Sequence, residues 1–308
     1  MKRIIIAITF LFISVRVSRA DWRGSFDDTY FAPEEEEATP TYFTWYELIG
    51  LPLAISVASA AWYDGHLYCI GGQNSSYTYL TNVYRLDATE WVEVEGIPVA
   101  GLGKMSTQWG SLLYTMGGGT PFTNVYTFDG STWSVGNPLQ GIGALNYDDS
   151  RGVYIDDGWM YLHSGYQITN LFKYNGTSTV ELVGIPDGKT QWGGGGGIID
   201  GIRYVAPGNN TTNFYKWVAS AWVATPGLPV QNRNWTMLSV ADKIFLSGSQ
   251  NGSTSVFCFD GISWQHTNAC PLGRAWLQGT CSDGTSLYYV GGAVGGSYGR
   301  TNVYRFGP

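Results

Sequence analysis

Three pairs of residues in the chain place a cationic side chain two or three positions before a tryptophan. The pairs are Arg233 with Trp235, Arg274 with Trp276, and Lys189 with Trp192. A guanidinium can bind a carboxylate through two parallel hydrogen bonds, and an aromatic ring can pack against the C–H face of a sugar. The six residues are therefore candidates for binding a sugar or a carboxylate of a protein partner.

Residues that commonly carry catalysis are sparse. The three histidines, His66, His163 and His266, are far apart in the sequence, and no Cys or His residues have the spacing of a metal site. The chain also lacks a nucleophile elbow, a phosphate-binding loop and a dinucleotide fingerprint. Asp148 and Asp149 could form an acid and base pair, although adjacent acids usually form a turn. The sequence thus favours a protein that is not an enzyme and that uses no metal and no cofactor.

A repeat of 41 to 47 residues organises most of the chain. Its first mark is an aromatic residue followed four positions later by a small residue, as in Tyr68 and Gly72. A segment that begins with Thr-Asn, such as the one at Asn82, follows, and a tryptophan such as Trp91 comes nine residues after it. Six units of this kind occur. A period of this length, carried by short apolar runs, is typical of arrays in which each unit is one small sheet.

The sixth unit has no tryptophan, because the sequence reaches Pro308 before the expected position. Trp45 lies 46 residues before Trp91 and begins the same Trp-x-x-x-x-Gly-x-Pro pattern. An open array of repeats would need a polar cap at each end, and neither end supplies one. We therefore expect the strand around Trp45 to complete the C-terminal sheet and to close a ring.

Together these features resemble the kelch repeat, which combines a tyrosine, a Gly-Gly doublet, a strand that begins with Asn, and a tryptophan. The resemblance spans residues 42–307, and it departs from the pattern at Ser164, Pro207, Val180 and Ser249. Kelch proteins are β-propellers. The resemblance therefore implies an all-β fold for residues 42–308: a six-bladed β-propeller with four strands in each blade.

The N-terminal residues have a different character. Residues 1–20 resemble a signal peptide, because Lys2 and Arg3 precede an apolar run and Ala20 ends a typical cleavage site. Residues 21–41 form an acidic leader that we expect to be disordered. The apolar run is too short for a membrane span, and no later segment qualifies. We expect the mature protein to be secreted, periplasmic or associated with the cell surface. A net charge of −7 argues against nucleic acid as a partner.

The four cysteines suit an oxidising compartment, and they allow three complete pairings. We favour a disulfide bond between Cys270 and Cys281, because they fall at the end of one unit and in the first strand of the next. Cys69 and Cys258 lie inside apolar runs, where a buried thiol is the more common state. The pairing stays open at this point.

Loop lengths indicate which face of the propeller binds a ligand. In each blade, the loops between the second and third strands and the loops between blades emerge on one face, which we call the long-loop face. Blade 3 carries an insertion on this face, with Tyr147, Asp148 and Asp149, and blades 1 and 6 carry its longest loops, which include Tyr298 and Arg300. Because functional residues concentrate on such loops, these five are also candidate ligand-binding residues.

Three functions are compatible with these observations. The first is an exported, non-catalytic module that recognises a glycan or a protein through its long-loop face. The second is a carbohydrate-processing enzyme that resembles the exported six-bladed kelch mutarotases of sialic acid, since an acidic sugar needs a guanidinium. The third is a surface protein in which the propeller is only a spacer. In kelch repeats an arginine at the position of Arg233 and Arg274 commonly holds neighbouring blades, so a structural role for both also stays open.

Overall fold

The computed structural model describes residues 43–118, 123–141, 153–163, 170–186, 194–207, 211–231, 235–248, 254–271, 275–276, 278–294 and 297–308. The expected signal peptide and acidic leader lie outside these residues. Within the described segments the chain forms β-strands and no helix, and hence no helix that could span a membrane. The all-β expectation is confirmed.

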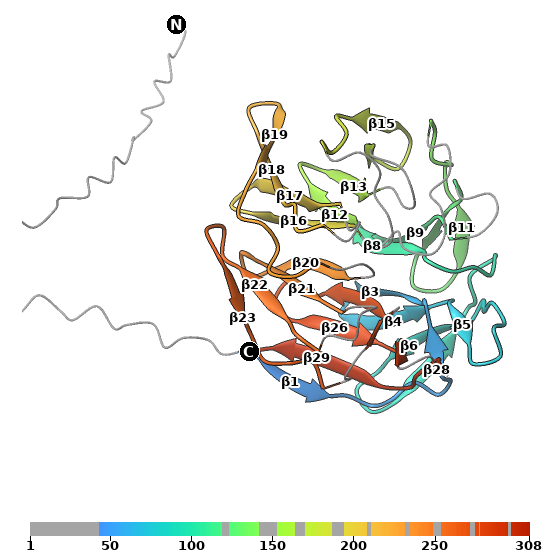
Figure 1. The fold of residues 1–308 in the computed structure, drawn as a ribbon. Helices are drawn as coiled ribbons and strands as arrows, with labels where there is room; N and C mark the ends of the chain where they lie inside the picture. Colours follow the sequence, from blue (N-terminus) through green and yellow to red (C-terminus); the bar gives the residue numbers. More distant parts are fainter. Residues whose placement is uncertain are drawn as a thin grey trace, which may run out of the picture. The chain divides into compact units, whose positions relative to one another are not determined.

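The strands form six antiparallel sheets of four strands, the blades of a propeller (Figure 1). Blade 1 contains β3 (Ser59–Tyr63), β4 (His66–Ile70), β6 (Val83–Leu86) and β7 (Trp91–Val94). Blade 2 contains β8 (Met105–Trp109), β9 (Leu112–Met116), β10 (Val125–Phe128) and β11 (Trp133–Val135). Blade 3 contains β12 (Val153–Asp156), β13 (Trp159–His163), β14 (Leu171–Tyr174) and β15 (Thr179–Leu182).

The second half of the ring repeats this plan. Blade 4 contains β16 (Gly195–Ile199), β17 (Ile202–Ala206), β18 (Tyr215–Val218) and β19 (Ala221–Ala224). Blade 5 contains β20 (Thr236–Val240), β21 (Lys243–Ser247), β22 (Phe257–Phe259) and β23 (Trp264–His266). Blade 6 contains β25 (Gly279–Ser282), β26 (Leu287–Val290), β29 (Val303–Gly307) and β1 (Thr44–Glu47).

Blade 6 is assembled from both ends of the described chain, as expected from Trp45. Strand β1 pairs antiparallel with β29, with Trp45 opposite Phe306, and Figure 1 shows the blue strand β1 beside the red strand β29. The indole ring of Trp45 stacks on Phe306 at 4.6 Å between ring centroids and lies 5.0 Å from the ring of Tyr289. The ring of blades is therefore closed by one strand from the N-terminal side.

The hydrophobic core lies between neighbouring blades. Successive side chains of a strand point to opposite faces, so Tyr68 and Ile70 of β4 pack in a cluster with blade 2. Leu67 and Cys69 of the same strand pack in a cluster with blade 6. Because both faces of the second strand of a blade are covered, second strands such as β4, β9 and β26 consist of nearly continuous apolar runs rather than alternating apolar and polar residues.

The periodic tryptophans connect the blades. The indole N–H of each donates a hydrogen bond to a backbone carbonyl that follows the outer strand of the preceding blade. The pairs are Trp91 with Ile49 (2.8 Å), Trp133 with Glu95 (2.9 Å), Trp222 with Val183 (3.0 Å), Trp264 with Pro226 (3.3 Å) and Trp45 with Asn268 (3.2 Å). In blade 3, where Val180 stands in place of tryptophan, the neighbouring Thr179 hydroxyl accepts a hydrogen bond from the N–H of Gln140 at 2.9 Å. The repeated tryptophans are thus part of the scaffold.

Tight turns join the first and second strands of the blades. Asp64 and Gly65 have φ values of 47° and 77°, and Asp157 and Gly158 have 46° and 72°. Two successive residues with positive φ match the twist of a two-residue hairpin, which is the reason for the Asp-Gly sequence at these positions. The face that carries these turns, which we call the tight-turn face, lies opposite the long-loop face.

Candidate functional site

Most of the residues selected from the sequence lie outside the described part of the structure. They are Arg233, Arg274, Lys189, Trp192, Tyr147, Asp148 and Asp149. The backbones of two others are described as strands: Trp276 in β24 (Ala275–Trp276) and Tyr298 in β28 (Ser297–Tyr298). The structure describes the side chains of Trp235 and Arg300, together with those of Cys270 and Cys281.

Trp235 is a core residue in this structure. Its side chain has an exposed fraction of 1% and packs with Phe214, Met237 and Leu246 between blades 4 and 5. A ligand on the surface has no access to the indole ring in this conformation. We therefore assign Trp235 to packing, in contrast to the ligand-stacking role expected from its place beside Arg233.

Arg300 connects the long loops of two blades. Its backbone forms an isolated bridge with Ile55, in which Ile55 N–H donates to the Arg300 carbonyl at 3.0 Å. Ile55 belongs to β2 (Ile55–Ser56), which pairs with β5 (Gln73–Asn74) in the long loop of blade 1. The side chain of Arg300 is half-buried, and the structure shows no hydrogen-bond partner for its Nε.

The long loops of blades 1 and 6 form small sheets of their own. In blade 6, β24 pairs with β27 (Ala293–Val294), which pairs with β28. In blade 1, the segment 73–79 folds back on itself through a bridge between Gln73 and Tyr79, and we call it the blade 1 hairpin. The long-loop face therefore has ordered β structure above these two blades, joined through Arg300.

Two tyrosines project from the blade 1 hairpin. Tyr77 is 60% exposed and Tyr79 is 52% exposed. The tip of the hairpin is fixed by the Asn74 side chain, whose Oδ1 accepts hydrogen bonds at 3.0 Å from the N–H groups of Ser76 and Thr78. Tyr77 has a φ of 63°, a left-handed conformation that costs energy for a residue with a side chain. The hairpin thus presents two aromatic rings to solvent from a well-bonded backbone.

Lys104, which precedes the inner strand of blade 2, is buried and has a structural role. Only 4% of the residue is exposed, and its Nζ donates a hydrogen bond to the backbone carbonyl of Gly118. Burial lowers the pKa of Lys104 to about 8. A Cβ on Gly118 would lie 2.3 Å from the Lys104 side chain, so only glycine leaves room for this lysine. Lys104 holds the Gly-Gly doublet of its own blade in place.

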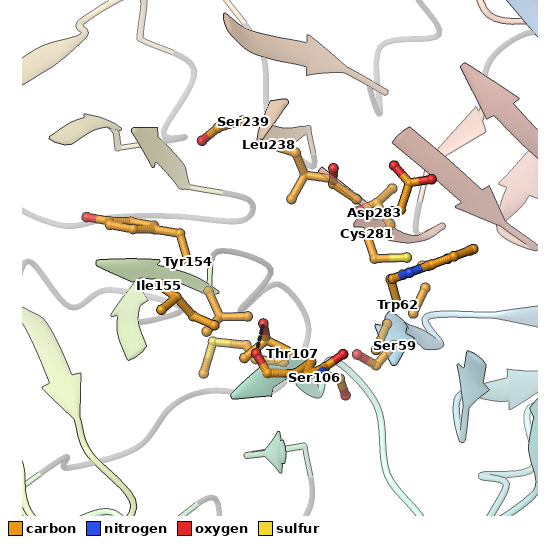
Figure 2. Close-up of a pocket in the computed structure, with 18 of the residues that line it drawn as sticks. Ser59, Trp62, Ser106, Thr107, Tyr154, Ile155, Leu238, Ser239, Cys281 and Asp283 are labelled. Carbon is orange, nitrogen blue, oxygen red and sulfur yellow. Dashed lines mark hydrogen bonds between the residues drawn. The ribbon is translucent and has the colours of Figure 1, made fainter. Parts of the chain in front are cut away.

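A cavity of about 620 Å³ lies at the centre of the ring. The inner strands of all six blades line it: β3, β8, β12, β16, β20 and β25. Figure 2 shows side chains from these strands around the shared space, including Trp62, Tyr154 and Cys281. We call it the axial cavity.

The axial cavity opens toward the tight-turn face. At the starts of the inner strands its lining residues are buried, as for Ser59 (5% exposed) and Gln278 (3%). At the other end Trp62 and Trp109 are partly exposed, and the turn residue Gly110 is exposed. The loop lengths in the sequence pointed to the opposite face, and they gave no sign of this opening.

The ionisable groups of the axial cavity are engaged or buried. Asp283 accepts hydrogen bonds from the Tyr288 hydroxyl (2.7 Å) and from the N–H groups of Thr285 and Ser286. Burial acts to raise the pKa of Asp283, but these hydrogen bonds outweigh burial and hold the pKa below its usual value. Burial raises the pKa of the Tyr154 hydroxyl well above 10. At neutral pH, Asp283 is therefore a carboxylate committed to its own turn.

His163 is a buried histidine that the sequence did not single out. It is 2% exposed, and neither ring nitrogen has a hydrogen-bond partner in the structure. Its ring faces β16 of blade 4, where a Cβ on Gly196 would lie 2.4 Å from Nε2. Burial lowers the pKa of His163 to about 4, so the imidazole is neutral at pH 7. This contact explains one glycine of the Gly-rich inner strand of blade 4 by packing alone.

The cysteines fall into different clusters. Cys281 packs with Cys69 between blades 6 and 1, whereas Cys270 packs with Tyr289 and Phe306. The disulfide bond that we favoured between Cys270 and Cys281 is not formed in this structure, and the pairing stays a prediction for the oxidised protein. Their positions in the sequence suggested that the two residues lie close together. Their side chains point into different clusters, however, and are therefore apart.

Comparison with known proteins supports the fold. Residues 58–95, which cover blade 1, match the model of the Kelch motif. No curated protein matches the sequence. Among solved structures, that of YjhT is similar, with a TM-score of 0.64, 12% sequence identity, and coverage of 84% of this chain and 95% of YjhT. The kelch-type propeller expected from the repeats is confirmed, and at this identity the likeness to YjhT concerns the fold alone.

Proposed function

We propose that this protein is an exported, non-catalytic recognition module that binds a glycan or another protein on its long-loop face. The observation that carries the proposal is the pair of exposed tyrosines, Tyr77 and Tyr79, on the blade 1 hairpin. Tyrosine supplies a large contact area with few rotatable bonds, and it is enriched among the residues that dominate binding energy.

The bonding of the hairpin supports this role. Ordering a loop on binding costs free energy, and a loop that is already held by hydrogen bonds avoids much of this cost. The pairing of β5 with β2, the Asn74 side-chain bonds and the bridge to Arg300 all act in this way. The positive φ of Tyr77 is a further indication, because backbone strain of this kind concentrates at functional sites.

The test compares the mature wild-type protein with a Tyr77→Ala, Tyr79→Ala double variant on glycan arrays and in pull-downs. The control is Ile262→Ala, which removes an even more exposed apolar side chain (79%) from a turn of blade 5. The double variant should lose a ligand that the control retains. If every ligand binds both variants equally, the long-loop tyrosines are not the binding site. If no glycan or protein binds at all, a spacer function replaces this proposal.

A carbohydrate-processing enzyme is the second candidate. The observation in its favour is the axial cavity, whose volume of about 620 Å³ lies in the usual range for small-molecule sites. Tyr154, Asp283 and Lys104 line this cavity and are the ionisable side chains to test. NMR of anomer equilibration, with and without protein, distinguishes the two candidates. Acceleration by the wild-type protein that is lost in Tyr154→Phe would favour the enzyme.

A further inference from the structure

We propose that the axial cavity is a second binding site, which opens on the tight-turn face and takes an uncharged sugar ring. The site is independent of the tyrosines proposed above, since it lies on the axis of the ring and opens at the opposite end of the blades. The hydrogen-bonding groups of the lining and its charge support this site.

The deep end of the cavity contains a hydrogen-bond acceptor that needs a donor. Gln278 lines the cavity with an exposed fraction of 3%, and its Oε1 has no hydrogen-bond partner in the structure. A buried polar atom without a partner costs roughly 1–3 kcal/mol, so such an atom is expected to meet a ligand or water. A hydroxyl group can donate to this oxygen, whereas a carboxylate or a phosphate dianion has no hydrogen to give.

Hydroxyl groups of the lining supply the complementary donors. The Ser239 Oγ accepts a hydrogen bond from the N–H of Ile198 at 2.7 Å, and the Ser282 Oγ accepts one from the N–H of Gly284 at 2.9 Å. Each of these hydroxyls has its own hydrogen left to donate. Thr280 adds a partly exposed hydroxyl to the same wall. A ligand that both donates and accepts at several positions, as a sugar does, matches this mixture.

The charge of the described lining favours a neutral ligand. The carboxylate of Asp283 already accepts several hydrogen bonds, and the Nζ of Lys104 is bonded to the Gly118 carbonyl. Among the described lining residues, no cation other than Lys104 could pair with an acidic sugar. Burying an unpaired carboxylate in such a cavity is costly, and burying a hydrogen-bonded neutral sugar is not.

Two tryptophans stand at the open end. Trp62 stacks on Tyr288 at 5.0 Å with an angle of 20° between the ring planes, and Trp109 meets the edge of Tyr114 at 5.5 Å. Each indole is held by a ring of its own or a neighbouring blade and still has a partly exposed surface. The Trp109 ring packs toward Gly176, in the turn between the outer strands of blade 3, and the Trp62 ring packs on blade 6, so both tryptophans belong to the rigid rim of the opening.

The test measures binding of neutral monosaccharides (glucose, galactose, mannose and N-acetylglucosamine) and of glucuronic and galacturonic acid by saturation-transfer NMR and calorimetry. At least one neutral sugar should bind more tightly than its acidic counterpart. Gln278→Leu should weaken this binding about fivefold or more, because the acceptor is lost. Thr280→Val, which keeps the shape of the side chain, gives a second reading if Gln278→Leu fails to fold.

The Tyr77→Ala, Tyr79→Ala double variant separates this site from the one on the long-loop face. Sugar binding in the axial cavity should be unchanged in that variant and in Ile262→Ala. The proposal is overturned if no neutral sugar binds at about 20 mM, which would mean that the cavity holds only water. It is equally overturned if only the uronic acids bind, or if Gln278→Leu and Thr280→Val both bind as the wild type does.

Discussion

Replacement of Trp45 should show how much the closing strand contributes to the stability of the whole ring. The indole stacks on Phe306, contacts the rings of Tyr289 and Tyr304, and donates to the Asn268 carbonyl at 3.2 Å. Trp45→Phe removes the hydrogen bond and keeps most of the ring contacts, so we expect the free energy of unfolding to fall by about 1 kcal/mol. Trp45→Ala removes the hydrogen bond and the ring contacts, so we expect the free energy of unfolding to fall by about 3 kcal/mol. This value is at the lower end of the range for replacing a large aromatic residue by alanine, because Trp45 is only half-buried.

Thermal unfolding followed by circular dichroism measures these losses. A domain of this size loses roughly 2–4 °C of melting temperature per kcal/mol, so Trp45→Ala should melt about 6–12 °C lower and Trp45→Phe about 2–4 °C lower. Ile262→Ala, at an exposed turn, is the control and should change the melting temperature by less than about 2 °C. Hydrogen exchange adds a local readout, since the amides of β1 and β29 should lose protection first.

A Trp45→Ala variant with the same melting temperature as the control would contradict a stabilising role of the closing strand. The closing strand would then be an addition to a ring that is already stable without it. If the alanine and phenylalanine variants melt at the same temperature, the ring contacts with Phe306 and Tyr289 contribute nothing to the stability of the ring.

Three further predictions concern the blade interface and the N-terminus. Gly196→Ala would place a Cβ 2.4 Å from His163 Nε2 and 2.7 Å from the Tyr204 carbonyl oxygen. The free energy of unfolding, measured in urea, should therefore fall by about 1–3 kcal/mol, and adding His163→Ala to this variant should restore part of it. Burial lowers the pKa of His163 from 6.5 to about 4, so between these pH values the unfolded chain binds more protons than the folded chain. The stability of the fold should therefore decrease as the pH drops from about 7 to about 5. His163 should account for about 2 kcal/mol of this fall, and a His163→Met variant with the same pH dependence as the wild type would contradict it. N-terminal sequencing of the protein from an exporting host should begin at Asp21, and an intact Met1 would rule out cleavage.

The fold could be predicted from the sequence because the repeat carries its own register. The spacing of Trp45 from Trp91 was enough to place β1 in blade 6, since a strand completes the sheet in which its repeat position is vacant. The hydrogen bonds of the tryptophans to the preceding blade explain why this residue recurs. Val180 shows that this position tolerates the loss of tryptophan when neighbouring polar groups supply other contacts between the blades.

The candidate site could be predicted only in part. The longest loops of the long-loop face were expected on blades 1 and 6, and there the structure places Arg300 and the blade 1 hairpin. The packing of Trp235 in the core was not foreseen, because a residue just before a strand can point to either face of its sheet, and sequence spacing does not tell which. The opening of the axial cavity was missed for a different reason. Its position depends on which ends of the inner strands converge, and that is a property of the assembled ring and not of any one loop.

The pairing of β1 with β29 also has a consequence for biosynthesis. Glu47, the last residue of β1, and Asn302, the residue before β29, are separated by 255 residues, and the Asn302 side-chain amide donates to the Glu47 carboxylate at 3.5 Å. At a translation rate of about 5–20 residues per second, the first strand waits roughly 10–50 s for its partner. During this time the outer edge of the nascent ring is unpaired and can associate with other chains. The synthesis of β29, and not the folding of any single blade, therefore sets the earliest moment at which the ring can close.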